Sequence, residues 1–352
     1  SERINNLQLT NFLGFTQNIN AAYTQFGHKV DKFSYLIGLR IEKTHIEINQ
    51  RTINIFKVKD YTDWFPTLNL SYEFNKKENL TLGFSRRIKR PRSWTLNPFR
   101  SLTSLTFFRQ GNPDLDPSYS NLLDLGYLKR WEKITFNSSV YYQRATGVIE
   151  RITDTTGALV IVSQDPFVEL PEFRSTSINL SKNIRTGTEF TLTYLPKRRV
   201  RISGNFNIFN SETIGEYNGT VLDRKIISWF TRMNSSFPIP LGINVQLRGF
   251  YFGPRANAQT ESKGILTFSG ALNKSLFKKK GELSFRVRDI LNSSRRKSTT
   301  ETIDFRNYTE FQWRQPSYVF TLTYRINERK MERKRNRNQN FGSGEDGEGP
   351  DF

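Results

Sequence analysis

The chain has 352 residues, a formal net charge of +20 and a mean hydropathy of -0.60, which fits two ordinary domains or one large unit. No run of 18 or more apolar residues occurs, so a membrane-spanning helix is excluded. Cysteine is absent, which excludes disulfides, zinc–thiolate sites and cysteine nucleophiles. The first residues have neither a basic start nor an apolar core and do not resemble a secretory signal.

Apolar residues recur at every second position in segment after segment. In one segment Leu68, Leu70, Tyr72 and Phe74 alternate with polar residues. The same alternation occurs in residues 33–41, 80–85, 200–208, 243–248, 283–288 and 318–326. Side chains on a strand point to opposite faces in turn, so each segment has one apolar and one polar face. The pattern predicts an all-β chain of about 13 strands of roughly 10 residues each, from near residues 15–26 to residues 317–326.

The connections between these segments alternate between short polar turns and long stretches. The long stretches are rich in Gly, Pro and Asn and are expected to be irregular: residues 46–62, 91–119, 146–184, 211–224, 254–263 and 290–316. In an up-and-down barrel, successive connections emerge at opposite ends. Because short and long connections alternate, one end carries the short turns and the other, here called the elaborated end, carries the long connections. This asymmetry is typical of transmembrane β-barrels with short periplasmic turns. Because such barrels have an even strand number, an odd count predicts a partner strand before residue 1.

Aromatic residues stand beside the short turns, where barrels carry girdles at the membrane interface. They are Phe26, Phe33, Phe74, Trp131, Tyr194, Phe237 and Phe277. Tyr and Phe are also good strand formers in any protein. A soluble β-sandwich with buried inner faces therefore stays an alternative.

The most specific block covers residues 84–127. It contains FSRRIKRPRSWTLNPF (84–99) and GNPDLDPSYSNLLDLGY (111–127), and it resembles the barrel of TonB-dependent outer-membrane receptors, most closely the Bacteroidetes branch. Residues 21–44, 142–152 and 187–194 resemble further strands of that family, so the resemblance covers most of residues 15–326. Ser118 departs from the family, which usually has Glu there.

The resemblance implies that residues 1–326 are the C-terminal strands of a transmembrane antiparallel up-and-down β-barrel of about 22 strands. Residues 327–352, a basic run followed by a Gly-rich acidic end, are expected to be a disordered periplasmic tail. The implied function is active uptake of a scarce nutrient (a siderophore, glycan, peptide or cofactor) across the cell outer membrane. The alternative is a structural or assembly subunit without transport. Implied partners are outer-membrane lipid and lipopolysaccharide, the protein's own N-terminal plug, the TonB complex and, as a further candidate, a surface lipoprotein.

Catalytic chemistry is poorly represented. His28 and His45 are the only imidazoles, and no G-x-S-x-G, H-E-x-x-H or P-loop pattern occurs, so we expect no enzyme, metal or cofactor. The basic residues are spread over turns, tail and expected lumen positions, with no RNP-like motif, so no nucleic-acid partner is expected. The expected lumen arginines are Arg201, Arg248, Arg286 and Arg288.

The candidate ligand-binding residues lie in the long connections of the 84–127 block. They are Arg90, Trp94, Asn97, Phe108, Arg109 and Asn112. Loops on rigid scaffolds often carry binding residues, but for each single residue a role in holding the loop itself is the favoured interpretation. Pro113 and Pro117 predict a stiff lead-in to the next strand. On that strand we expect Leu123, Leu125 and Tyr127 to face lipid and Asp124 and Gly126 to face the lumen.

Overall fold

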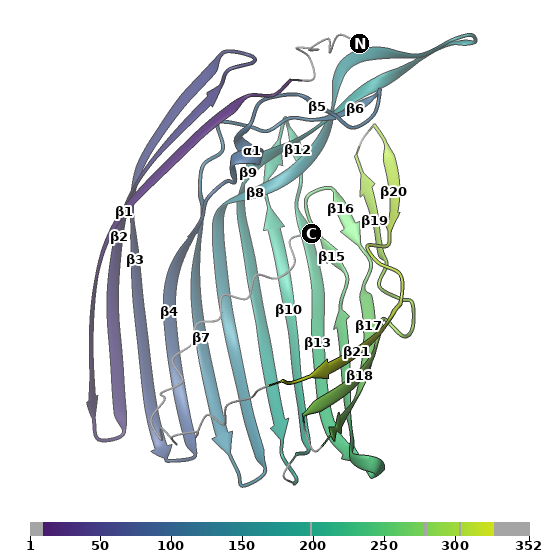
Figure 1. Cartoon of the computed structure of the whole chain (residues 1–352). Coiled ribbons are helices and arrows are strands. Elements are labelled where there is room, and N and C mark those ends of the chain that lie inside the picture. Colours follow the sequence, from purple (N-terminus) through teal and green to yellow (C-terminus); the bar gives the residue numbers. More distant parts are fainter. Residues whose placement is uncertain (1–9, 198, 278–279, 303, 327–352) are drawn as a thin grey trace.

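The computed structural model describes residues 10–197, 199–277, 280–302 and 304–326 (Figure 1). Its main sheet is an antiparallel path of 13 strands in the order β1-β2-β3-β4-β7-β8-β9-β10-β13-β14-β17-β18-β21. The bounds are β1 Leu13–Val30, β2 Phe33–Gln50, β3 Ile55–Asn75, β4 Glu78–Lys89, β7 Ser118–Arg130, β8 Ile134–Gln164, β9 Phe167–Tyr194, β10 Arg201–Ile214, β13 Arg224–Ile239, β14 Ile243–Phe252, β17 Ile265–Leu276, β18 Gly281–Arg288 and β21 Ser317–Tyr324.

Short helices and strands lie in the connections between the strands of this sheet. They are α1 Ser93–Leu96, β5 Ser101–Leu102, β6 Phe107–Arg109, β11 Glu216–Tyr217, β12 Thr220–Val221, the 3-10 turn η1 Pro240–Gly242, β15 Arg255–Ala256, β16 Thr260–Ser262, β19 Arg296–Glu301 and β20 Arg306–Phe311. All except η1 lie in connections at the end of the sheet opposite the short turns (Figure 1). No helix in the described ranges is long and apolar enough to cross a membrane.

The sheet curves into a trough, with the short turns at the bottom of Figure 1 and the elaborated connections at the top. The expected antiparallel up-and-down order and the strand number are confirmed. In the described part of the chain β1 pairs only with β2, and β21 only with β18. The size of the closed barrel, about 22 strands, stays a prediction. The expected tail, residues 327–352, lies outside the described residues.

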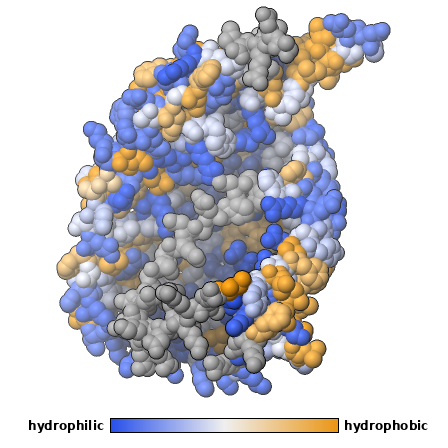
Figure 2. Space-filling model, viewed as in Figure 1, coloured by the Kyte–Doolittle hydropathy of each residue, from blue (hydrophilic) through white to orange (hydrophobic). Residues whose placement is uncertain are grey.

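The two faces of the sheet differ as the alternation predicts. On β7, Leu123 and Leu125 are each 46% exposed on the outer face. On the opposite face, a Cβ atom added to Gly83 of β4 would lie 2.6 Å from Oδ1 of Asp124, so the two residues share the inner wall. Much of that hollowed inner wall is hydrophilic in Figure 2. Because the apolar faces of this single curved sheet remain uncovered, the β-sandwich alternative is wrong.

The aromatic residues beside the short turns also occupy the expected outer surface. Of the seven residues named above, all but Phe237 are exposed. Several pack ring against ring, as Tyr72 and Phe74 do at 5.1 Å and Phe277 and Tyr324 do at 5.7 Å between centroids. These exposed rings at one level agree with an interfacial girdle.

Two of the stretches expected to be irregular are regular strand instead. β2 and β3 stay paired as far as Gln50 and Ile55, and β8 and β9 as far as Gln164 and Phe167. The expectation for residues 46–62 and 146–184 was therefore wrong. Both stretches are rich in β-branched Ile, Val and Thr, which favour strands. Continuing the ladder also satisfies backbone N–H and C=O groups beyond the part that spans the membrane.

Candidate ligand-binding site

The connection between β4 and β7, residues 90–117, packs onto neighbouring strands rather than extending freely from the end of the sheet. Leu96 of α1 and Leu115, each 1% exposed, form a hydrophobic cluster with Ile46 and Ile48 of β2. Ile149 of β8 also packs against this cluster. Burial of such side chains stabilises a contact by roughly 1.5–3 kcal/mol each. The apolar cluster therefore ties the connection to both β2 and β8.

Arg90, the first residue of this connection, is bound to two neighbouring strands. Its guanidinium donates to Oε2 of Glu42 at 2.6 Å and to Oγ1 of Thr44 at 2.9 Å, both on β2. Its Nε also donates to the hydroxyl of Tyr61 on β3 at 3.2 Å. Only 16% of the Arg90 side chain is exposed. Arg90 therefore anchors the loop in this structure.

The side chains of Asn97 and Asn112 tie the two halves of the connection to β2 and β9. Oδ1 of Asn97 accepts from Nε2 of Gln50 at 2.9 Å, and Nδ2 of Asn112 donates to the carbonyl of Ser177 on β9 at 3.2 Å. Gly111 lies between the halves, where a Cβ atom would come within 2.5 Å of the Asn97 carbonyl oxygen. Only glycine fits such a close backbone approach.

The stiff stretch after Gly111 is fixed by lysines from β3. Nζ of Lys59 donates to the carbonyl of Leu115 at 2.6 Å and to Oδ1 of Asp116 at 3.0 Å, and Lys57 pairs with Asp114. Asn179 of β9 accepts from the backbone N–H of Asp116 at 2.8 Å. The two aspartates of this stretch thus orient the loop by specific contacts to β3 and β9.

Phe108 and Arg109 lie on β6, which pairs in parallel with β9. Phe108 is 5% exposed, and the guanidinium of Arg100 lies 4.1 Å from its ring centroid. Arg109 is exposed, as is Trp94 on α1 at 55%. The guanidinium of Arg151 on β8 lies 5.5 Å from the Trp94 ring. Arg90, Asn97, Phe108 and Asn112 thus make contacts within the protein, whereas Trp94 and Arg109 face solvent.

Two charged residues of β8 that sequence reasoning missed lie beside this loop. Burial raises the pKa of Glu150 to about 7, although the nearby charge of Lys89 opposes the shift. Burial also lowers the pKa of Arg151, and the charges of Arg109 and Arg296 lower it further. Both β8 residues lie in the stretch 146–184, which was expected to be irregular. No local sequence signal distinguishes them, because their neighbours come from distant segments.

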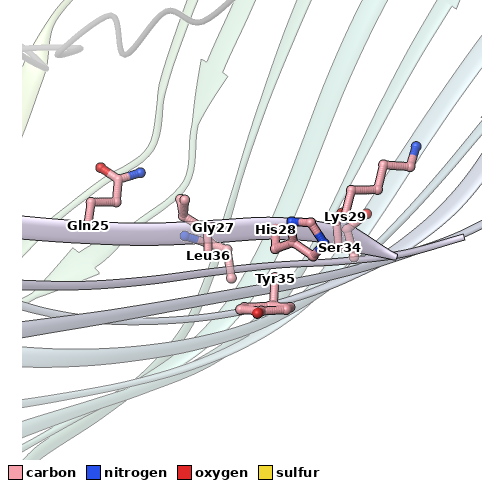
Figure 3. A pocket seen from close by; sticks show the side chains of 9 residues that line it. Gln25, Gly27, His28, Lys29, Ser34, Tyr35 and Leu36 are labelled. Atoms are coloured by element: carbon pink, nitrogen blue, oxygen red, sulfur yellow. The ribbon is translucent and has the colours of Figure 1, made fainter. Parts of the chain in front are cut away.

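Arginines also line a hollow of about 810 Å³ on the inner wall between β10 and β21. The four arginines expected in the lumen, Arg201, Arg248, Arg286 and Arg288, all line it, together with Arg314. Another hollow, of about 600 Å³, lies at the turn between β1 and β2. Figure 3 shows its side chains on different sides of two strands, with Tyr35 directed away from Gln25, so it is an open strand surface.

The histidines are not placed for nucleophilic or metal chemistry. His45 lies between Oδ1 of Asp60 at 2.8 Å and Oε1 of Glu47 at 3.1 Å, and the hydrogen bond to Asp60 raises its pKa. His28 lies in β1 near the opposite end of the sheet. Within the described ranges, no group of three or more His, Asp or Glu side chains is arranged to hold a metal ion.

Comparison with solved structures shows the same fold in outer-membrane proteins. The FrpB iron transporter of Neisseria meningitidis (F3-3 variant) has a TM-score of 0.58 and 11% identity over 89% of this chain and 46% of its own. The ferric yersiniabactin uptake receptor FyuA of Yersinia pestis has a TM-score of 0.59 and 13% identity over 88% of this chain and 45% of its own. The siderophore receptor PirA of Pseudomonas aeruginosa has a TM-score of 0.54 and 14% identity over 90% of this chain and 58% of its own.

The chain therefore spans about half the length of these solved structures. No curated protein matches the sequence significantly. Assignment to the Bacteroidetes branch stays a prediction. The sequence does match the outer membrane protein beta-barrel family over residues 1–324, nearly the whole chain. In agreement with its curved antiparallel sheet and exposed apolar faces, the chain belongs to this family of cell outer-membrane barrels.

Proposed function

We propose that this chain is the barrel wall of a TonB-dependent receptor that actively takes up a scarce nutrient across the outer membrane. The fold supports this proposal, because solved structures with a similar fold are an iron transporter, a ferric yersiniabactin uptake receptor and a siderophore receptor. The family and these neighbours point to a non-enzymatic transporter. The nutrient belongs to the siderophore, glycan, peptide or cofactor class.

The observation that carries this proposal is the ordered construction of the elaborated end. The 90–117 connection is held against β2, β3, β8 and β9 by buried leucines, Arg90 and Asn112, and it borders a largely hydrophilic inner wall (Figure 2). A barrel that serves only as a membrane anchor requires an apolar outer face, whereas a rigid polar surface at the mouth is suited to binding a ligand. Binding sites gain affinity when their groups are held in place before the ligand arrives.

Within this surface, we assign different roles to the six candidate residues. Trp94 and Arg109 are exposed and contact the ligand. Arg90, Asn97, Phe108 and Asn112 are positioning residues, since their side chains are engaged within the protein. Trp94 offers an apolar face and Arg109 a cation, a combination that suits a ligand with ring and acid groups.

The proposal also names partners outside this chain. An N-terminal plug closes the lumen and contacts the inner wall, and TonB acts on that plug through the preceding segment. Lipid and lipopolysaccharide contact the exposed leucines and aromatic rings of the outer face. A surface lipoprotein is the candidate partner at the elaborated end.

The test uses the complete gene in its own host, in three strains: wild type, a deletion, and a variant that lacks the TonB-interacting segment. An outer-membrane band that migrates differently before and after boiling shows that each receptor is folded. Uptake of labelled siderophores, glycans, peptides and cofactors is then measured. Loss of uptake of one class in both altered strains supports the proposal. An envelope defect in the deletion alone, with every uptake rate unchanged, would establish the structural alternative instead.

A further inference from the structure

Five arginines from distant segments gather at the elaborated end of the sheet. This arginine cluster consists of Arg109 on β6, Arg151 on β8, Arg185 on β9, Arg255 on β15 and Arg296 on β19. They lie on five different strands that are far apart in the sequence, so no local motif indicates the cluster. Their proximity results from the way the outer connections pack on one another.

Hydrogen bonds fix this packing. Gln259, in the β15–β16 hairpin, accepts from the backbone N–H of Thr153 at 2.7 Å and donates to the Thr153 carbonyl at 3.1 Å. Thr153 is two residues from Arg151, so this contact brings the hairpin to β8. β16 then pairs with β19, where Thr260 lies opposite Thr300. β6 joins from the other side by pairing with β9.

Strand pairing brings these residues together. Arg255 lies opposite Ser262, which lies opposite Ser298, two residues from Arg296. Arg109 and Arg151 lie opposite Ser175 and Ser177 of β9. In agreement, burial lowers the pKa of Arg255 to about 10, with the charges of Arg296 and Arg185 contributing, and burial also lowers the pKa of Arg151, with Arg109 and Arg296 contributing. No carboxylate contributes an opposing effect at either residue, so the group is a concentration of positive charge.

Aromatic rings take the place that carboxylates usually occupy. Guanidinium-to-ring distances are 5.5 Å for Arg151 and Trp94, 4.8 Å for Arg185 and Phe209, and 3.2 Å for Arg255 and Phe252. Among the described residues, none of the five guanidinium groups forms an ion pair or hydrogen bond, and the Nε of Arg185 is buried without a partner.

Arginines with a structural role in this protein have carboxylate partners, which the cluster lacks. Arg90 is paired with Glu42 at 2.6 Å and Arg174 with Asp154 at 2.7 Å. Gathering like charges without counterions costs free energy, and an arriving anion would offset that cost. Arg109, Arg151 and Arg255 are exposed overall, although packed neighbours desolvate the guanidinium groups of Arg151 and Arg255, so an anion can reach the cluster from solvent.

We propose that the arginine cluster binds acidic oxygens, of carboxylate or phosphate type, on the nutrient that this receptor takes up. The inference rests on the proposed uptake function and narrows its ligand to a molecule with several negative charges. Guanidinium groups suit this task because they donate paired N–H groups to carboxylate and phosphate oxygens. Trp94, stacked with Arg151, lies beside the ring-bearing or apolar part of the same ligand.

The test uses the purified full-length receptor in detergent and isothermal titration with pyrophosphate and with citrate. We expect binding that weakens as salt rises, and no heat with sucrose. The Arg151→Gln/Arg296→Gln variant should bind both anions roughly tenfold or more weakly. The Arg151→Lys/Arg296→Lys variant should retain part of the affinity, and the Arg87→Gln control all of it. Because Gln relieves like-charge repulsion, the double Gln variant should remain heat-modifiable on gels.

Lack of binding by the wild type, or equal binding by the double Gln variant, overturns the inference. The first outcome would show that the cluster is neutralised within the complete protein, for example by plug carboxylates. Failure of the uptake proposal is seen separately, in strains whose transport is unaffected by gene deletion. In that case anion binding that depends on Arg151 and Arg296 would still establish the site.

Discussion

Replacing Arg90 with Ala should release the 90–117 connection from the wall. The substitution removes donors to Glu42 at 2.6 Å, Thr44 at 2.9 Å and Tyr61 at 3.2 Å. Glu42 keeps one cation, because Nε of Arg40 lies 2.6 Å from its Oε1. The change therefore costs hydrogen bonds but leaves no isolated charge.

The size of the effect follows from these contacts. A hydrogen bond to a charged group contributes about 1.5–3 kcal/mol, and one between a guanidinium and a hydroxyl lies near the lower end of that range. Partial relaxation and entry of water reduce the sum, so we expect the connection to lose about 3 kcal/mol of local stability. At about 1.4 kcal/mol per factor of ten, its amide hydrogens should exchange roughly a hundredfold faster.

Hydrogen exchange of peptides from residues 91–117, measured by mass spectrometry on the folded receptor, tests this expectation. Arg87→Ala is the matched control, because Arg87 lies on β4 three residues before Arg90, is exposed and has no side-chain partner in the described ranges. Arg90→Ala and Glu42→Gln should also be coupled, with a double variant less affected than the sum of both. An exchange rate within about threefold of the Arg87→Ala control would refute the anchoring role.

Three further predictions concern the faces, the loop core and the pH response. Leu125→Arg should cost about 2–4 kcal/mol and reduce the amount of heat-modifiable barrel, whereas Asp124→Asn should not, and equal effects would contradict the assignment of faces. Leu96→Ala should loosen the connection by about 2–5 kcal/mol in the same exchange experiment, while exposed Leu105→Ala should leave it unchanged. Because the folded pKa of Glu150 is raised to about 7 from 4.5, the folded state holds its proton more tightly than the unfolded chain. Protection of the β8–β9 hairpin should therefore fall as pH rises from about 4.5 through 7, and Glu150→Gln should remove that dependence; a fall of equal size in the variant would assign the effect to another group.

The sequence by itself determined the strands and the direction of their faces. Leu123 and Leu125 point outward and Asp124 inward because side chains alternate at period two along any strand, whatever the strand pairs with. The alternation of short and long connections likewise determined the up-and-down order, since each strand must begin at the end where the last one finished. Both features depend on neighbours in the chain, which a sequence displays directly.

Only the tertiary structure decided how the elaborated end is built. The sequence marked Arg90, Asn97 and Asn112 as candidates, but their roles depend on Glu42, Gln50 and Ser177, which lie on other strands. The sequence pattern also predicted irregular loops where the β2–β3 and β8–β9 hairpins continue outward. This prediction was wrong because ladder hydrogen bonds to a partner strand have no local signature. The arginine cluster is the extreme case, since five segments meet there through contacts between residues far apart in sequence. Local periodicity determines an element and its faces, whereas long-range packing determines which charged groups meet.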